Sequence, residues 1–168
     1  EFGPEFEALQ LAEVEREQLE RELDEAEAAG YSREEARAMI DEIDAFMNAN
    51  VTPEMRERFH YSWEGWVPEL HKKMADAGLL FLSSPELGGR GVGPYARSAA
   101  RKTLEKHGYS NPAAGVAEMV GLMVSRAGSD ELKAEVLPRI IAGDAICSLG
   151  YSEPQSGSDV FAAQTRAI

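Results

Sequence analysis

The sequence is poor in cysteine, histidine and positive charge, and each shortage argues against a class of protein. It has one cysteine, Cys147, and three histidines without metal-ligand spacing, so neither an internal disulfide nor a metal site is predicted. Acidic residues outnumber Lys and Arg by 30 to 17, and the net charge of −13 disfavours binding to nucleic acid or to anionic membranes. No apolar run approaches the ~20 residues that span a bilayer, and no secretory leader is visible. We therefore expect a protein of the cytoplasm, or of an organellar matrix after processing.

The negative charge is concentrated at the start of the chain. Residues 1–35 contain thirteen acidic residues against three arginines, a balance of −10, so the other 133 residues carry only −3. Residues 5–29 predict a long polar helix with a narrow apolar stripe that includes Leu9, Leu19 and Leu23. Two interpretations stay open: the stripe closes on the chain's own core, or it docks on a partner.

Capping residues and apolar periodicity predict helices through the middle of the chain. Ser32, followed three residues later by Glu35, has the pattern of a capping box. Further helices are predicted at 53 onward, 68–77, 94–107, 113–127 and 130–142. The helix at 113–127 is apolar on all sides, which predicts burial in the core, whereas His71 and His107 are expected to face solvent.

The character of the sequence changes at Ala145. Residues 146–151 read as a strand, 152–159 as a polar turn and 162–168 as a second strand. A single pair of strands is rarely stable alone in water, so these residues predict the beginning of a second, β-rich domain.

Two segments carry features of ligand sites. Residues 91–96 fit the G-x-G-x-x-A pattern of a dinucleotide fingerprint, but a turn rather than a strand precedes them, and Pro94 removes an amide donor, so a structural turn is predicted. The turn at 152–159 presents serine hydroxyls beside backbone amides, which suits an anionic or polar ligand. On spacing alone, an ordinary surface turn explains it equally well.

The second of these segments resembles a known signature. Residues 150–159, Gly-Tyr-Ser-Glu-Pro-Gln-Ser-Gly-Ser-Asp, resemble the flavin-site motif of the acyl-CoA dehydrogenase family. Pro85-Glu86-Leu87-Gly88-Gly89-Arg90-Gly91, Leu137-Pro138 with Ile140 and Gly143-Asp144, and Gln164-Thr165-Arg166-Ala167 resemble further parts of that family in the same order. The resemblance covers about residues 36–168, and the first 35 residues have no counterpart in it.

The resemblance implies a mainly α fold, with a helical bundle domain of acyl-CoA dehydrogenase type followed by the first strands of a β-barrel domain. The expected division is an acidic helical extension at 1–31, a helical domain at 32–143 and the truncated beginning of a middle β domain at 144–168.

By the same resemblance, the cofactor is FAD and the substrate an acyl-CoA, oxidised to a 2,3-enoyl-CoA as in β-oxidation and related lipid metabolism. The residues implied in cofactor binding are Leu149, Gly150, Tyr151, Ser152 and Ser158. Those implied in substrate binding are Ser158, Met119 and Met123, the methionines having core packing as an alternative.

The family's other requirements are expected to be met by residues outside this sequence. Its glutamate base comes from a third domain, so no catalytic residue is assigned here, and the fragment alone is expected to be inactive with weak flavin binding at most. Electron-transfer flavoprotein is the implied electron acceptor, and a homo- or hetero-oligomer the implied assembly. The alternatives are a helical interaction module or a non-catalytic subunit of a heteromeric dehydrogenase.

Overall fold

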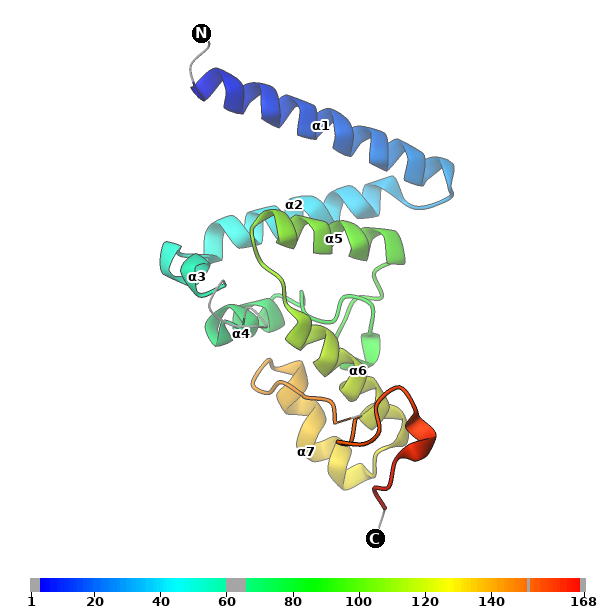
Figure 1. The fold of residues 1–168 in the computed structure, drawn as a ribbon. Coiled ribbons are helices and arrows are strands. Elements are labelled where there is room, and N and C mark those ends of the chain that lie inside the picture. The colour runs from blue at the N-terminus through cyan, green and yellow to red at the C-terminus, as the bar shows by residue number, and fades with distance from the viewer. Residues whose placement is uncertain (1–3, 60–65, 151, 167–168) are drawn as a thin grey trace.

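The chain folds into helices joined by short loops, as a computed structural model shows for residues 4–59, 66–150 and 152–166 (Figure 1). Within these residues the elements, in chain order, are α1 (Pro4–Ala28), α2 (Arg33–Asn50), α3 (Pro53–Arg58), α4 (Pro68–Asp76), η1 (Pro85–Leu87), α5 (Pro94–Lys106), α6 (Pro112–Ala127), α7 (Asp130–Ile141) and η2 (Val160–Ala162). The helices predicted from the sequence are all present, and their starts and ends follow the predicted capping residues closely.

The most extensive helix pairing joins α2 to α5, which lie side by side (Figure 1). The predicted apolar face of α2 is buried there, and α5 meets the core through two small residues, Ala96 and Ala100, each 1% exposed. Small side chains at this position let the two helix backbones approach closely, so the predicted periodicity of residues 36–47 is confirmed.

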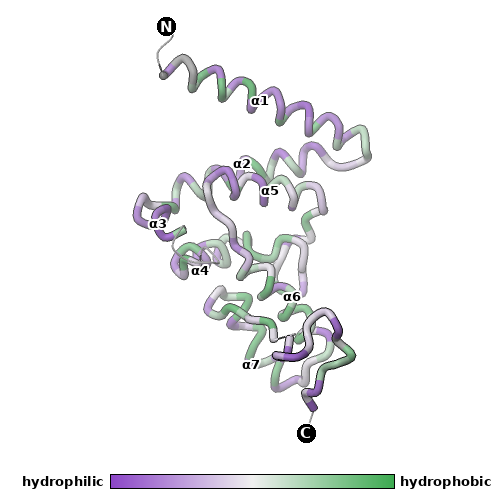
Figure 2. Tube along the Cα trace, viewed as in Figure 1, coloured by the Kyte–Doolittle hydropathy of each residue, from purple (hydrophilic) through white to green (hydrophobic). Residues whose placement is uncertain are grey.

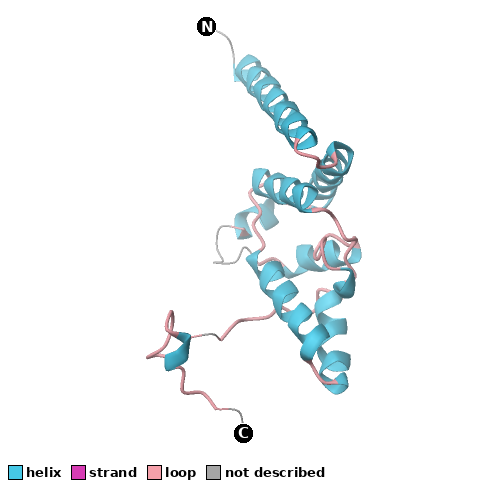
Figure 3. Ribbon diagram, turned by 90° about the vertical axis from the view of Figure 1, so that its right-hand side faces the viewer, coloured by secondary structure: helices cyan, strands magenta, loops and turns pink. Residues whose placement is uncertain are grey.

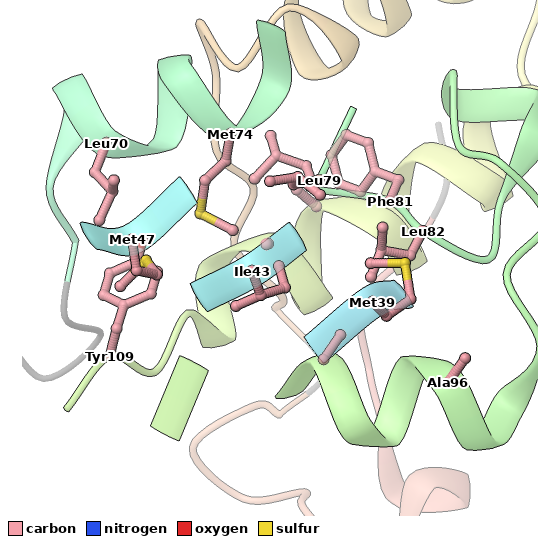
Figure 4. Close-up of a cluster of buried hydrophobic side chains, with 14 of the residues drawn as sticks. Met39, Ile43, Met47, Leu70, Met74, Leu79, Phe81, Leu82, Ala96 and Tyr109 are labelled. Atoms are coloured by element: carbon pink, nitrogen blue, oxygen red, sulfur yellow. The ribbon is translucent and has the colours of Figure 1, made fainter. Parts of the chain in front are cut away.

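The core lies where α2 meets α4 and the apolar link at residues 79–82 (Figure 4). Ile43 and Met47 of α2 are fully buried, and Leu70 and Met74 of α4 reach toward them. The predicted burial of the link is confirmed, with all four of its residues below 10% exposure. The helical domain is therefore organised around α2.

The two halves of α1 differ in their surroundings. Its C-terminal half packs on the body through Leu23 and Ala26, which are buried, while Leu9 in the N-terminal half is 70% exposed. Figure 2 shows α1 as largely hydrophilic. The interpretation that the stripe closes on the chain's own core is thus confirmed for the C-terminal half only.

Polar contacts hold the C-terminal half of α1 in place. Glu20 pairs with Arg33 and Arg37 of α2. The Tyr95 hydroxyl of α5 donates to the Glu22 carbonyl oxygen at 2.9 Å, and Lys102 Nζ lies 3.1 Å from Glu22 Oε2. These contacts hold the C-terminal half of α1 against α2 and α5.

The prediction of two strands after Ala145 is wrong for the residues that the structure describes. Residues 145–150 are extended without ladder partners, and residues 160–162 form the 3-10 helix η2 (Figure 3). One isolated bridge joins Glu153 and Ser156. A strand requires hydrogen bonds to a neighbouring strand, and the described part of the chain offers none to this segment.

Helix α6 also differs from its prediction, because only one of its faces is buried. Ala113, Ala117 and Gly121 are buried, and α6 packs on η1 and α7, whereas Met119 is 41% and Met123 61% exposed. An apolar helix packed on one side only leaves its other apolar face on the surface, so the prediction of all-round burial is corrected.

His71 and His107 were expected at the surface and are not. His71 is fully buried on α4, with its ring 4.4 Å from that of Trp66, and the His107 side chain is 13% exposed with Nε2 2.8 Å from Asp44 Oδ1. The neighbouring lysines that suggested exposure lie on other faces of the same helices, because adjacent helical positions point in different directions.

Candidate functional site

The turn at residues 152–159 is closed by its own backbone and side chains. Glu153 and Ser156 exchange two backbone hydrogen bonds of 2.8 and 3.0 Å, and Ser156 Oγ donates to the Asp159 carbonyl oxygen at 2.8 Å. Ser156 is consequently 4% exposed. The turn is a defined structure rather than an open loop, even where no sheet supports it.

Glu153 ties the turn to the chain that follows it. Its carboxylate accepts hydrogen bonds from the backbone N–H groups of Gln164, at 2.8 Å, and Thr165, at 2.6 Å. A side-chain hydrogen bond from Thr165 has the largest effect in lowering the pKa of Glu153, and the backbone hydrogen bonds of Gln164 and Thr165 lower it further. The sequence analysis assigned no role to this residue, although a carboxylate beside Pro in a turn is a usual partner for backbone amides.

Ser152 and Ser158 remain available on the outside of this turn. Both are exposed, and neither hydroxyl hydrogen-bonds within the described residues. The backbone N–H groups of Gly157 and Ser158 also donate no hydrogen bond there. A hydroxyl and consecutive free amides are the donor set that an anionic or polar ligand requires, so these residues fit the phosphates and polar ring edge of a flavin.

The other predicted cofactor-binding residues precede the turn. Leu149 is 37% exposed and Gly150 is exposed, both in extended chain rather than in a strand, and Tyr151 lies outside the described residues. Figure 3 shows η2 and the loops beside it lying apart from α6 and α7. The predicted cofactor and substrate residues are therefore not brought together in this structure.

Met119 and Met123, predicted to line an acyl pocket, do border a cavity. It has a volume of about 350 Å³ between α6 and the link that leads to η1, and its lining is Ser83, Ser84, Arg97, Gly115, Glu118, Met119, Leu122, Met123 and Arg126. The polar residues of this cavity were not found by the sequence analysis. Nothing in their spacing marks them, because they come from three separate elements.

The glycine-rich turn at residues 88–93 is structural, as predicted. An added Cβ on Gly89 would lie 1.7 Å from the Phe81 carbonyl oxygen, and Gly88 and Gly91 have positive φ angles of 78° and 69°. The Gly93 N–H, at the start of α5, donates to Glu35 Oε1 at 3.0 Å. A carboxylate already occupies the place where a nucleotide phosphate would bind, which excludes this use of the motif.

The described residues contain no cluster of three or more His, Cys, Asp or Glu that would hold a metal ion. Burial raises the pKa of the Cys147 thiol, which makes it a poor nucleophile. Among the same residues, no helix has both the length and the apolar character needed to cross a membrane.

Comparison with known proteins identifies the family. Residues 33–144 match the family model described as acyl-CoA dehydrogenase, N-terminal domain, and the chain belongs to this family. The matched range begins at α2 and ends after α7, so α1 and the segment after residue 144 lie outside it.

The curated relatives are longer proteins. The chain is 28% identical to acyl-CoA dehydrogenase FadE29 of Mycobacterium tuberculosis, covering 80% of this chain and 35% of the relative. It is 26% identical to (2S)-methylsuccinyl-CoA dehydrogenase of Cereibacter sphaeroides, covering 80% of this chain and 25% of that protein. The chain thus spans about a third or less of these relatives.

Solved structures agree with this assignment. The ChsE4–ChsE5 complex of Mycobacterium tuberculosis matches with a TM-score of 0.64 at 29% identity, covering 80% of this chain and 34% of that one. A variant of the Tcur3481–Tcur3483 steroid acyl-CoA dehydrogenase matches with the same TM-score at 26% identity, covering 78% and 35%. The mainly helical fold is therefore that of this family's N-terminal domain.

Proposed function

We propose that this chain forms the helical part of an FAD-dependent acyl-CoA dehydrogenase that converts an acyl-CoA into a 2,3-enoyl-CoA. One observation carries the proposal: in a chain of this family, a self-closed turn leaves Ser152, Ser158 and two backbone amides unused on its outer side. The family match makes a flavin the ligand to which these groups are best suited.

In this proposal, each residue of the turn has a role. Ser152 would hydrogen-bond to the polar edge of the flavin ring, and the main chain at residues 149 and 150 would help to hold that ring. Ser158 and its amide donate to phosphate oxygens of the cofactor and of CoA. The Glu153 carboxylate accepts hydrogen bonds from the backbone N–H groups of residues 164 and 165, and so keeps the turn joined to the chain that follows it.

The reaction removes hydrogen from Cα and Cβ of the acyl group. A base takes the α proton, which becomes acidic only if the thioester carbonyl oxygen accepts hydrogen bonds. FAD, when bound, supplies the acceptor for the hydride that leaves Cβ. We assign no base among the 168 residues and propose that it comes from a domain outside them, with electron-transfer flavoprotein reoxidising the cofactor.

In the same proposal, the exposed face of α6 is a wall of the acyl pocket. Met119 and Met123 are apolar and adaptable, and they border a cavity rather than the chain's own core. The relatives' names range from methylsuccinyl-CoA to steroid substrates, so the family match alone leaves the acyl group open.

The visible spectrum tests the proposal. The natural polypeptide or complex that contains these 168 residues should be yellow when purified, and acyl-CoA added without oxygen should bleach it. A protein that stays colourless with added FAD would reject a flavin role.

Serine variants test the residue roles. Ser152→Ala and Ser158→Ala should each weaken FAD retention by about tenfold, since each removes a hydrogen bond to the cofactor. Ser110→Ala is the matched control, because Ser110 is an exposed serine in the helical domain. Equal FAD retention in all three variants would contradict the assigned roles.

A second candidate function is a subunit–subunit contact made by α1. Leu9, Leu11 and Val14 are 70%, 61% and 55% exposed on a helix outside the family match, and one structural neighbour is described as a complex. We infer that the N-terminal half of α1, through these exposed apolar residues, binds another dehydrogenase subunit. Replacing the three residues with serine should lower the mass of the assembly in light scattering, and an unchanged mass would refute the contact.

A further inference from the structure

The cavity beside α6 is lined by both apolar and charged side chains. Met119, Leu122 and Met123 are apolar, whereas Glu118, Arg97 and Arg126 are charged and Ser83 and Ser84 are polar. Gly115 also borders it, and an added Cβ there would meet no atom within 4 Å. An acyl pocket for a plain hydrocarbon needs no such charges, since a charged group that a hydrocarbon covers loses its contact with water.

A short chain of hydrogen bonds joins Glu118 to Arg97 through Ser83. Ser83 Oγ, at 2.8 Å, and Ser84 Oγ, at 2.5 Å, both donate to Glu118 Oε1. Arg97 Nη1 donates to Ser83 Oγ at 2.7 Å. Ser84 is 4% exposed, so the carboxylate is held from a buried residue and does not move freely.

Part of this cluster remains unused. Both serines donate to the same oxygen, and within the described residues no side chain hydrogen-bonds to Glu118 Oε2. The Arg97 guanidinium has five N–H donors, of which one is used by Ser83. A strong acceptor and several donors therefore border the same cavity as the methionines.

We propose, on the basis of the dehydrogenase function above, that this cavity selects an acyl group that carries a hydroxyl group. A hydroxyl donates to Glu118 and accepts from Arg97 at once, while the hydrocarbon part of the acyl group contacts Met119 and Met123. A plain alkyl chain covers Glu118 Oε2 and the unused N–H groups of Arg97 without hydrogen-bonding to them.

The test compares two CoA thioesters, octanoyl-CoA and ω-hydroxyoctanoyl-CoA, on the flavoprotein that contains this chain. We expect the hydroxylated thioester to have a kcat/KM at least about tenfold higher. A site that hydrogen-bonds a substrate hydroxyl discriminates strongly against an analogue that lacks it. Calorimetric binding of both thioesters gives a readout that does not depend on turnover.

Variants assign the preference to the cluster. Glu118→Met and Arg97→Met should each bring the ratio close to one. Arg101→Met should keep it, because Arg101 lies on the same helix as Arg97, is 74% exposed and does not line the cavity. Arg97 is itself exposed, so its variant is expected to fold even if Glu118→Met does not.

The outcomes separate the two proposals. A preference for octanoyl-CoA, or an unchanged ratio in Arg97→Met, would overturn the hydroxyl assignment and leave the dehydrogenase function standing. Failure to bind or oxidise any acyl-CoA would overturn both.

Discussion

At the residue scale, Gly89 is the position least able to change. Its backbone lies against the carbonyl oxygens of Phe81 and Ser84, at 1.7 and 2.8 Å from where a Cβ would stand. Gly89→Ala should destabilise the fold by about 1–3 kcal/mol or more, since the backbone on both sides must shift.

Urea unfolding measures this cost, and Gly115→Ala is its control. Gly115 is helical with open space around its Cα, so alanine there should be neutral or stabilising by about 0.5–1 kcal/mol. Equal stabilities of the two variants would show that the turn relaxes more easily than its contacts indicate.

His71 should make the stability of the protein depend on pH. Burial lowers its pKa from 6.5 to about 4, and Asn111 Nδ2 lies 3.2 Å from Nδ1. The Asn111 Oδ1 already accepts from Ala114 N, so the amide group faces the ring and donates to Nδ1, which places the proton of the neutral ring on Nε2.

In the unfolded chain His71 is protonated near pH 6.5, whereas in the folded chain it stays neutral until the pH approaches 4. Stability should be full above pH 6.5 and decline as the pH falls toward 4, by an amount on the order of 3 kcal/mol. Urea midpoints between pH 4 and 7 measure the slope, and His71→Gln should flatten it. An identical slope in the variant would refute the role of His71.

At the element scale, α1 should behave as two segments. Leu23 is fully buried against the body, so Leu23→Ala should cost about 2–5 kcal/mol and loosen the helix. Leu9→Ala should change the stability by less than about 0.5 kcal/mol, because Leu9 is 70% exposed. Urea unfolding of both variants, with limited proteolysis of α1, checks the contrast.

Glu35 shows how an element is completed from elsewhere in the fold. The predicted capping box is half present: Ser32 Oγ accepts from the Glu35 N–H at 3.1 Å. The Glu35 carboxylate instead accepts from Gly93 N at the start of α5. The sequence motif correctly predicts the start of α2, but the contact that joins two helix ends depends on their packing.

At the scale of the whole molecule, the segment after residue 145 lacks the cover that its apolar residues require. Ile146 is 41%, Leu149 37% and Phe161 98% exposed. Exposed apolar residues of this size are typical of a surface that a partner or another domain covers, as the middle β domain implied by the resemblance would do.

Hydrogen exchange should distinguish the turn at residues 152–159 from the packed helices. Amides of residues 157 and 158 have no hydrogen-bond partner among the described residues and should exchange rapidly, whereas those of α2 should be protected. In the flavoprotein, FAD should slow the exchange at 157 and 158 and leave α2 unchanged. Rapid exchange at both amides with FAD bound would contradict the phosphate role of Ser158.

The sequence by itself determined the helical domain, its capping residues and its family. These features depend on local backbone preferences and on a periodic apolar face. Ser32 and Thr52 are capping residues and Ile43 belongs to the apolar face, and both signals can be read from neighbouring residues in the sequence. The turn motif was visible for the same reason, because its glycine and serines are adjacent in sequence.

Only the tertiary structure decided which surfaces are buried and which polar groups meet. The cluster of Glu118 with Ser83, Ser84 and Arg97 joins three elements, and the exposed side of α6 depends on where η1 and α7 pack. Local propensity predicted strands after Ala145. A strand forms only when a neighbouring strand supplies hydrogen bonds, and the described residues supply no such strand.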